Sequence, residues 1–525
     1  MKDFRTWLPW VGGVIVVSGI IAALDSHGTL FSGWPAYLIL VACMAAVIWL
    51  AWRWVAEGES PRFLIVALVV AIALRLGLGI AFTYALPQFG YDEEPQRAGY
   101  VYSDAFTRDI DAWSLAASDQ NLLTAFTESP SSDQYGGLLF LSAFIYRFLS
   151  PDIHRPLLIV VIATTISSLA VLFTFRFTKM TFGAKAATLA VWLIVLYPDA
   201  VLLGSSQMRE AFIGTAFGIA LFGYGVLREG HLKKGLLAIL LAIVVLALPI
   251  SPPYAVAILL TVGIGWLWEG RLRVVRSRWL LLPILGLALV AIILAVRAWS
   301  AIGGLSGSGM EVLLDWWRSV GGQWQRDTLW MQSDWTRRLL KATPEWAQLP
   351  FFTIYGLIRP FLPAALIDRG LPIWRSIAIW RGLGWIVLLP FLLYAPLAAI
   401  RGKGWRSLPA YLSVMVWFTA LLASYRGTGD LWDNPRYRAA FLAAQVALAG
   451  WAWINAEKVG SLWLKRTFVL VGVSMALFTV WYGFRYNLLP YFSVLHAVGV
   501  VIAFIVLFLS GSILYDSYQA RKSEA

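Results

Sequence analysis

The sequence predicts an all-α polytopic membrane protein with about 14 transmembrane helices. Of its 525 residues, 59% are hydrophobic and 14% are charged, whereas soluble domains carry about 25% charged residues. Apolar stretches that approach or exceed the roughly 20 residues of a bilayer-spanning helix recur along the whole chain. The basic residues gather in every second short loop between these stretches, as the positive-inside rule expects.

The expected spans begin near the N-terminus and continue to the last twenty residues. They cover 8–24, 34–55, 61–86, 156–177, 184–203, 207–226, 235–249, 253–268, 279–299, 376–400, 407–424, 435–455, 463–483 and 490–515. The first is expected to be retained, because its apolar run lacks an A-x-A cleavage pattern. Pro252 and Pro253 interrupt the pattern between 235–249 and 253–268, because proline cannot continue a helix.

The basic clusters predict the orientation of the chain. They begin with Lys2 and Arg5, end with Arg521 and Lys522, and all fall on one side of the expected topology. The positive-inside rule therefore places both termini in the cytoplasm of a multi-pass plasma-membrane protein. The net charge of +13 is explained by these loops, so nucleic acid is not an expected partner.

The long connections divide the chain into four parts. Two N-terminal spans at 1–60 precede a transmembrane core at 61–299, which contains an acidic outer loop at 87–155. A Trp-rich outer loop at 300–375 follows, and C-terminal helices occupy 376–525. Tryptophan mixed with Arg and Asp is typical of helices in the headgroup layer. Two apolar stretches within these loops, 136–149 and 350–366, are expected to be re-entrant or interfacial.

The acidic outer loop is the first candidate for chemistry. The segment FGYDEEPQRAGYVYSDAFTRDIDAW places six carboxylates within twenty residues: Asp92, Glu93, Glu94, Asp104, Asp109 and Asp111. An oriented carboxylate at a membrane surface can act as a general base. The alternative is a solvated acidic loop without a chemical role.

Charged residues at the outer ends of later spans form two more candidates. Asp199, Arg209 and Glu210 lie in LYPDAVLLGSSQMRE, where they either face a shared cavity or form a structural ion pair. Guanidinium groups bind phosphate in bidentate fashion, and an outward set could hold a lipid phosphate or diphosphate instead of making ordinary headgroup contacts. That set is Arg359, Arg426, Arg436 and Arg438. The four histidines are dispersed and Cys43 is the single cysteine, so a metal site is not predicted.

Taken in order, these segments resemble the GT-C class of membrane glycosyltransferases, which includes the protein-mannosyl and aminoarabinose transferases. The class has an acidic motif in its first long outer loop, similar to SDAFTRDIDAW or the earlier YDEE. A short helix, a basic turn, a second outer turn and a late Arg-Tyr pair follow. Here QYGGLLFLSAFIYRFLSPD, FRFTKMTFG, YPDAVLLGSSQMRE and NPRYRAAF look like them. The chain departs from the class in its two extra N-terminal spans and in the residues that open the short helix.

The resemblance implies a polyprenyl-phosphate-linked sugar donor and an acceptor lipid, glycan or protein at the outer face. Asp104 would be the general base, with Asp92 or Glu93 as the alternative, and Glu210 would complete the polar site. Four arginines would bind the donor phosphate: Arg209, Arg359, Arg436 and Arg438. A divalent cation could share the acidic loop, although the residues do not require one.

Three other functions fit parts of the pattern. A lipid-linked-oligosaccharide flippase or other transporter would suit the proline break and the interior charges of Arg75 and Arg381. An O-antigen polymerase or ligase would share the outward arginines without needing the acidic loop. A non-catalytic assembly subunit would need neither set.

Overall fold

A computed structural model shows the fold of the chain. It describes residues 2–55 except 26 and 28, then 62–127, 133–270, 334–427, 431–486 and 493–524, together with a few isolated positions between these ranges. Of the residues in these ranges, 84% are helical, and no strand occurs among them. The all-α class predicted from the sequence is therefore confirmed.

The N-terminal third contains three long helices and a set of short ones. The hairpin of α1 and α2 packs beside α7, and α3 packs against α7 and α9. Between α3 and α7 the chain forms short helices, of which α5 and α6 pack on each other. The bounds are α1 (Lys2–Ala23), α2 (Leu30–Val55), α3 (Arg62–Phe89), α4 (Glu94–Arg97), α5 (Ser103–Ala117), η1 (Leu122–Phe126) and α6 (Gly137–Leu149).

The central helices form the core of the molecule. In both α7 and α10, 94% of the most apolar window is buried inside the protein, and the two helices pack on each other. Pro198 begins α9 and bends it by 56° from α8, because proline disrupts helix continuation. The bounds are α7 (Leu157–Phe182), α8 (Ala184–Leu196), α9 (Pro198–Gly204), α10 (Arg209–Arg228), α11 (Leu232–Leu241), η2 (Ala242–Ala247), α12 (Leu248–Ile250) and α13 (Pro252–Trp268).

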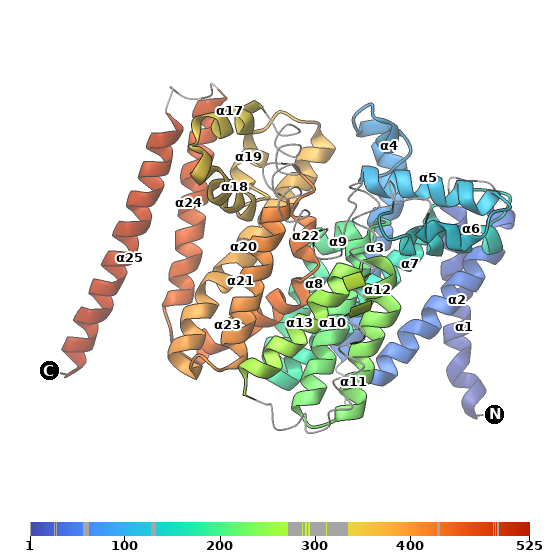
Figure 1. Cartoon of the computed structure of the whole chain (residues 1–525), viewed down its shortest axis with the longest axis horizontal. Helices are drawn as coiled ribbons and strands as arrows, with labels where there is room; N and C mark the ends of the chain where they lie inside the picture. The colour runs from blue at the N-terminus through green and yellow to red at the C-terminus, as the bar shows by residue number, and fades with distance from the viewer. Residues whose placement is uncertain are drawn as a thin grey trace.

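The C-terminal part adds a second layer beside this core. Helix α20 packs on α21, α23 and α24, and α23 joins this layer to α8. Helix α25 contacts α24 and is otherwise largely exposed, at one edge of the molecule (Figure 1). The bounds are α17 (Asp334–Ala342), α18 (Glu345–Leu357), α19 (Leu362–Ile367), α20 (Pro372–Lys403), α21 (Leu408–Arg426), α22 (Arg436–Ala439), α23 (Leu442–Val459), α24 (Trp463–Arg485) and α25 (Val494–Glu524).

The helices define a multi-pass membrane protein, although the predicted number of 14 spans is not confirmed. Nine helices in the described ranges are long and apolar enough to cross a bilayer, or ten if the bent pair α8 and α9 forms one span. The expected span at 253–268 is a helix of 17 residues, which is short for a crossing. The expected span at 279–299 falls outside the described ranges.

Both chain ends lie at one side of the bundle, and several of the short helices lie toward the other. Figure 1 shows the two termini at the lower side and α4, α5, α6, α17, α19 and α22 toward the upper side. We call this upper side the distal face. The stretches 136–149 and 350–366 form short helices there, namely α6, the end of α18 and α19. The tryptophans between 316 and 330, which contribute to the predicted Trp-rich loop, fall outside the described ranges.

Candidate functional site

Arg436 joins three carboxylates that come from distant parts of the sequence. Its Nη2 donates to Asp104 Oδ2 at 2.7 Å. Its Nε lies 3.6 Å from Glu210 Oε1, and its Nη1 lies 3.4 Å from Asp433 Oδ2. We call these four residues the Arg436 cluster. Three of the residues singled out in the sequence therefore meet in one place on the distal face.

Short helices and helix ends position the cluster. Asp104 is in the first turn of α5, Glu210 is in the first turn of α10, and Arg436 begins α22. Carboxylates are favoured in a first helical turn, where the backbone N–H groups carry partial positive charge. The side chain of Asp104 is 44% exposed, whereas that of Glu210 is 4% exposed. The cluster therefore has one carboxylate open to a substrate and one enclosed by protein.

Asp133 links two further arginines to the site. It accepts hydrogen bonds from the backbone N–H groups of Leu138 and Leu139, so it caps the start of α6. Arg108 Nε and Arg209 Nη1 each lie 3.9 Å from its carboxylate oxygens. Arg108 also donates to the carbonyl of Gln207 at 2.7 Å. The buried Nη1 of Arg209 has no hydrogen-bond partner, so it retains an N–H group that can donate to an anion.

The surroundings of Asp104 keep its carboxylate ionised. Burial alone would raise its pKa, but the charge and hydrogen bond of Arg436 outweigh burial, and Arg108 and Arg209 add to the effect. The pKa of Asp104 therefore lies below its usual value of 3.8. Burial lowers the pKa of the Arg108 guanidinium, although Asp133 opposes this shift.

A buried ion pair and a buried arginine lie next to the cluster. Arg381 Nε donates to Asp199 Oδ1 at 2.6 Å, and both side chains are at most 3% exposed. Arg438 donates to the carbonyls of Leu357 and Arg359 at 3.1 and 2.6 Å. The sequence suggested no acidic partner for Arg381 within a span, but the bend before α9 turns Asp199 toward it.

Four other expected site residues make their contacts outside the Arg436 cluster. Asp92 is 90% exposed and pairs with Arg97 at 3.6 Å. Glu93 accepts a hydrogen bond from Gln96 at 3.2 Å. Arg359 lies over the ring of Tyr355 and donates to its hydroxyl group. Arg438 donates hydrogen bonds to two backbone carbonyls, and these bonds stabilise the turn between α18 and α19.

Sequence reasoning did not single out Arg108, Asp433 and Asp133 as site residues. Arg108 follows Asp104 by one turn of α5, and its side chain is buried. This spacing can be read from SDAFTR in the sequence. Asp433 lies three residues before Arg436, close enough to pair with it. Asp133 stands where the resembled class has another residue, and its role as a helix cap is visible only once α6 begins at Gly137.

Another buried carboxylate, Asp109, is on α5, the helix that carries Asp104. It accepts a hydrogen bond from Tyr100 at 2.5 Å, another from Tyr146, and lies 2.8 Å from His154 Nε2. Burial, followed by the Asp109 charge, raises the pKa of the Tyr100 hydroxyl well above its ordinary value. These contacts fix α5 against α6 and the segment before α7.

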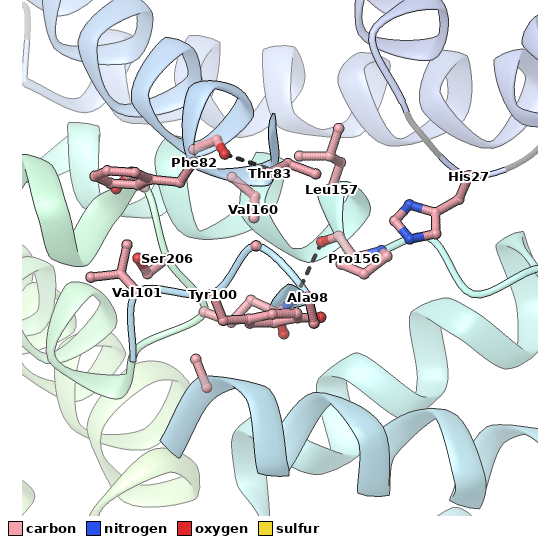
Figure 2. Close-up of a pocket in the computed structure, with 15 residues that line it drawn as sticks. His27, Phe82, Thr83, Ala98, Tyr100, Val101, Pro156, Leu157, Val160 and Ser206 are labelled. Atoms are coloured by element: carbon pink, nitrogen blue, oxygen red, sulfur yellow. Dashed lines mark hydrogen bonds between the residues drawn. The ribbon is translucent and has the colours of Figure 1, made fainter. Parts of the chain in front are cut away.

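A small and mainly apolar cavity of about 40 Å³ lies between the ends of α3 and α7 and the turn before α10. Figure 2 shows His27, Pro156 and Leu157 on one side of it, and Phe82, Val101 and Ser206 on the other. Ala105 and Gln207 also line it; Ala105 follows Asp104 in the chain, and Gln207 lies two residues before Arg209. The lining residues do not include the Arg436 cluster or Arg209 themselves.

No group of three His, Cys, Asp or Glu side chains suited to a metal ion occurs in the ranges that the structure describes. No protein-family model matches the sequence, and comparison with curated proteins and with solved structures gives no match either.

Proposed function

We propose that this protein transfers a sugar from a polyprenyl-phosphate-linked donor to an acceptor, on the extracytoplasmic side of the plasma membrane, as GT-C-type glycosyltransferases do. The observation that carries the proposal is the meeting of Asp104, Glu210 and Arg436, with the charge of Arg209 also acting on Asp104. Ala105, the residue after Asp104, lines a small apolar cavity. A reaction between a lipid-linked donor and a polar acceptor needs charged groups and apolar space side by side.

The proposed reaction is a single displacement with inversion. The acceptor hydroxyl oxygen forms a bond to the anomeric carbon, while the bond between that carbon and the phosphate oxygen breaks. Asp104 takes the hydroxyl proton, and the polyprenyl phosphate leaves with the bonding electron pair. A base and charge stabilisation of the leaving group are the two main needs of such a transfer.

Asp104 suits the role of base through its exposure and charge. Arg436 keeps it ionised at neutral pH and orients one of its oxygens, while 44% of the side chain remains accessible to an acceptor. Its lowered pKa makes it a weak base, so proton transfer belongs late in the reaction, when the acceptor oxygen has become acidic.

Arg209 suits the role of phosphate ligand better than Arg436. Three carboxylates surround the guanidinium of Arg436, whereas Arg209 Nη1 lies 3.9 Å from one carboxylate, that of Asp133, and makes no hydrogen bond to it. Charge-assisted hydrogen bonds to phosphate are about twice as strong as neutral ones.

The test is sugar transfer from polyprenyl-phosphate donors by the full-length protein in liposomes. Asp104→Asn should lower the rate by about 10²- to 10⁴-fold, as expected for loss of a general base. Asp92→Asn is the matched control, because Asp92 is an exposed carboxylate in the same loop. Full activity in Asp104→Asn together with loss in Asp92→Asn would move the base to the YDEE segment.

The flippase or transporter alternative predicts movement of an intact lipid-linked glycan without a new glycosidic bond. The pairing of Arg381 with Asp199 weakens this alternative, because it neutralises one of the two interior charges that favoured it. Flux of a fluorescent lipid-linked glycan without glycosyl product would support the alternative and overturn the transferase proposal. An O-antigen polymerase- or ligase-like reaction would show instead as transfer from a diphosphate-linked donor that persists in Asp104→Asn.

A further inference from the structure

Four aromatic rings form a continuous row that ends at the Arg436 cluster. Successive ring centroids are 6.5 Å apart for Tyr91 and Trp374, 4.9 Å for Trp374 and Trp432, and 5.0 Å for Trp432 and Tyr102. The Arg436 guanidinium carbon then lies 5.9 Å from the centre of the Tyr102 ring. We call these four residues the aromatic row. Three separate segments contribute to it, so no local pattern in the sequence reveals it.

Polar contacts hold the row in place. Buried Gln96 accepts hydrogen bonds from the Trp374 indole at 2.8 Å and from the backbone N–H of Tyr91 at 2.6 Å. Arg381 donates to the carbonyl of Trp432 and lies 5.3 Å from the centre of its ring. The rings are therefore held in fixed positions before any ligand arrives, which lowers the entropy cost of binding.

Two rings of the row are exposed although they are large and apolar. Tyr91 is 44% exposed and Trp432 is 40% exposed. Their chain neighbours, Asp92 and Asp433, have side chains 90% and 27% exposed. Exposed carboxylates beside these rings indicate a surface that faces water rather than lipid, since charge is costly in hydrocarbon. Fixed aromatic rings at such a surface offer apolar faces on which a ligand can pack.

We infer that the aromatic row is a saccharide-binding subsite, and that the acceptor in the proposed reaction is a glycan chain. Sugar rings present C–H groups with partial positive charge, which pack against the electron-rich faces of aromatic rings. Carboxylates beside those rings accept hydrogen bonds from sugar hydroxyls. Tyr102, the last ring of the row, is buried, and exposed Trp432 stacks on it. A glycan bound on Tyr91 and Trp432 would therefore extend toward the Arg436 cluster and present its terminal hydroxyl to Asp104. The placement as acceptor site rests on the proposed function; the saccharide binding does not.

The test measures binding without any donor. The full-length protein in lipid nanodiscs is titrated with maltohexaose, cellohexaose and chitohexaose by calorimetry and by saturation-transfer NMR. At least one of the three should bind saturably. Trp432→Ala should weaken binding by about tenfold, the effect of losing one aromatic stacking contact. Trp432→Phe, which keeps a ring, should retain most of the affinity.

Two further variants separate a binding role from a structural one. Tyr91→Ala alters the exposed far end of the row, away from the Arg436 cluster, and should also weaken binding. Trp346→Ala is the matched control, because Trp346 is 83% exposed in α18 and outside the row. Absence of saturable binding by the wild-type protein would overturn the inference. So would equal affinities of the wild type and the Trp432 and Tyr91 variants, or an equal loss in Trp346→Ala.

A transfer assay distinguishes failure of this inference from failure of the proposed function. Transfer by the wild-type protein, with an acceptor KM that Trp432→Ala and Tyr91→Ala leave unchanged, overturns the glycan subsite alone. Saturable binding that depends on both rings, in a protein that transfers no sugar, overturns the transferase proposal and upholds the subsite.

Discussion

Replacing Arg436 with methionine should destabilise the protein mainly through Glu210. The substitution removes the guanidinium that lies 3.6 Å from Glu210 Oε1. The Glu210 side chain is 4% exposed and its second oxygen already lacks a hydrogen-bond partner, so water cannot solvate the charge that remains. Breaking a buried ion pair from one side costs about 3–5 kcal/mol, and we expect Arg436→Met to lower the unfolding free energy by this amount.

A second substitution shows whether burial of Glu210 is the cause. Glu210→Gln removes the charge, so the double variant with Arg436→Met should regain at least about 2 kcal/mol relative to Arg436→Met alone. Asp104→Asn is the matched control, because Asp104 is 44% exposed and water can solvate it. Combined with Arg436→Met, it should regain less than about 1 kcal/mol.

Unfolding by SDS titration in mixed micelles, followed by circular dichroism, measures these differences. The size-exclusion profile of each variant after a heat step gives an independent check of folding. Equal recovery with Glu210→Gln and Asp104→Asn would refute the reasoning, because the cost would then not follow from the burial of Glu210.

Three further predictions follow from other parts of the fold. Asp199→Asn leaves the guanidinium of Arg381 buried without its carboxylate and should cost about 3–5 kcal/mol of unfolding free energy in the same assay, with partial recovery in the double variant with Arg381→Met. The pKa of Asp25 lies below 3.8, because hydrogen bonds from neighbouring side chains outweigh the effect of burial. The ionised carboxylate therefore stabilises the fold above pH 3.8, and this contribution is lost as the pH falls through the lowered pKa. On acidification, the thermal unfolding midpoint should fall less in Asp25→Asn than in the wild type. Gly137→Ala would place a methyl group 2.1 Å from a backbone carbonyl of α12 and should lower the unfolding free energy by about 1–3 kcal/mol. Gly263→Ala, whose added methyl group meets no neighbouring atom within 4 Å, should be neutral or stabilising. Equal effects of the two substitutions would contradict the packing argument.

Composition and hydropathy were sufficient to predict an all-α membrane protein and most of its long helices. The apolar runs that became α3, α7, α10 and α20 are continuous in sequence, and a bilayer-spanning helix satisfies its backbone hydrogen bonds within itself. The short helix α6 was also visible, because its apolar run is too short for a crossing. The exact number of spans was harder to predict, since α8 and α9 bend at a proline and α13 is short.

By residue type and position, the sequence placed Asp104 among the six carboxylates of the acidic loop, and Glu210 and Arg436 among the charged residues at the outer ends of spans. The choice of Asp104 as base followed from the family resemblance. The sequence could not show that Arg436 contacts both carboxylates, because the partners are separated by hundreds of residues and meet only when α5, α10 and α22 pack together. Nor could it separate Asp104 from Asp92, which belong to one acidic loop and differ in what surrounds them. Lipid solubility and backbone hydrogen bonding act locally and can be read from the chain, whereas charge pairing depends on distance in space, which tertiary packing decides.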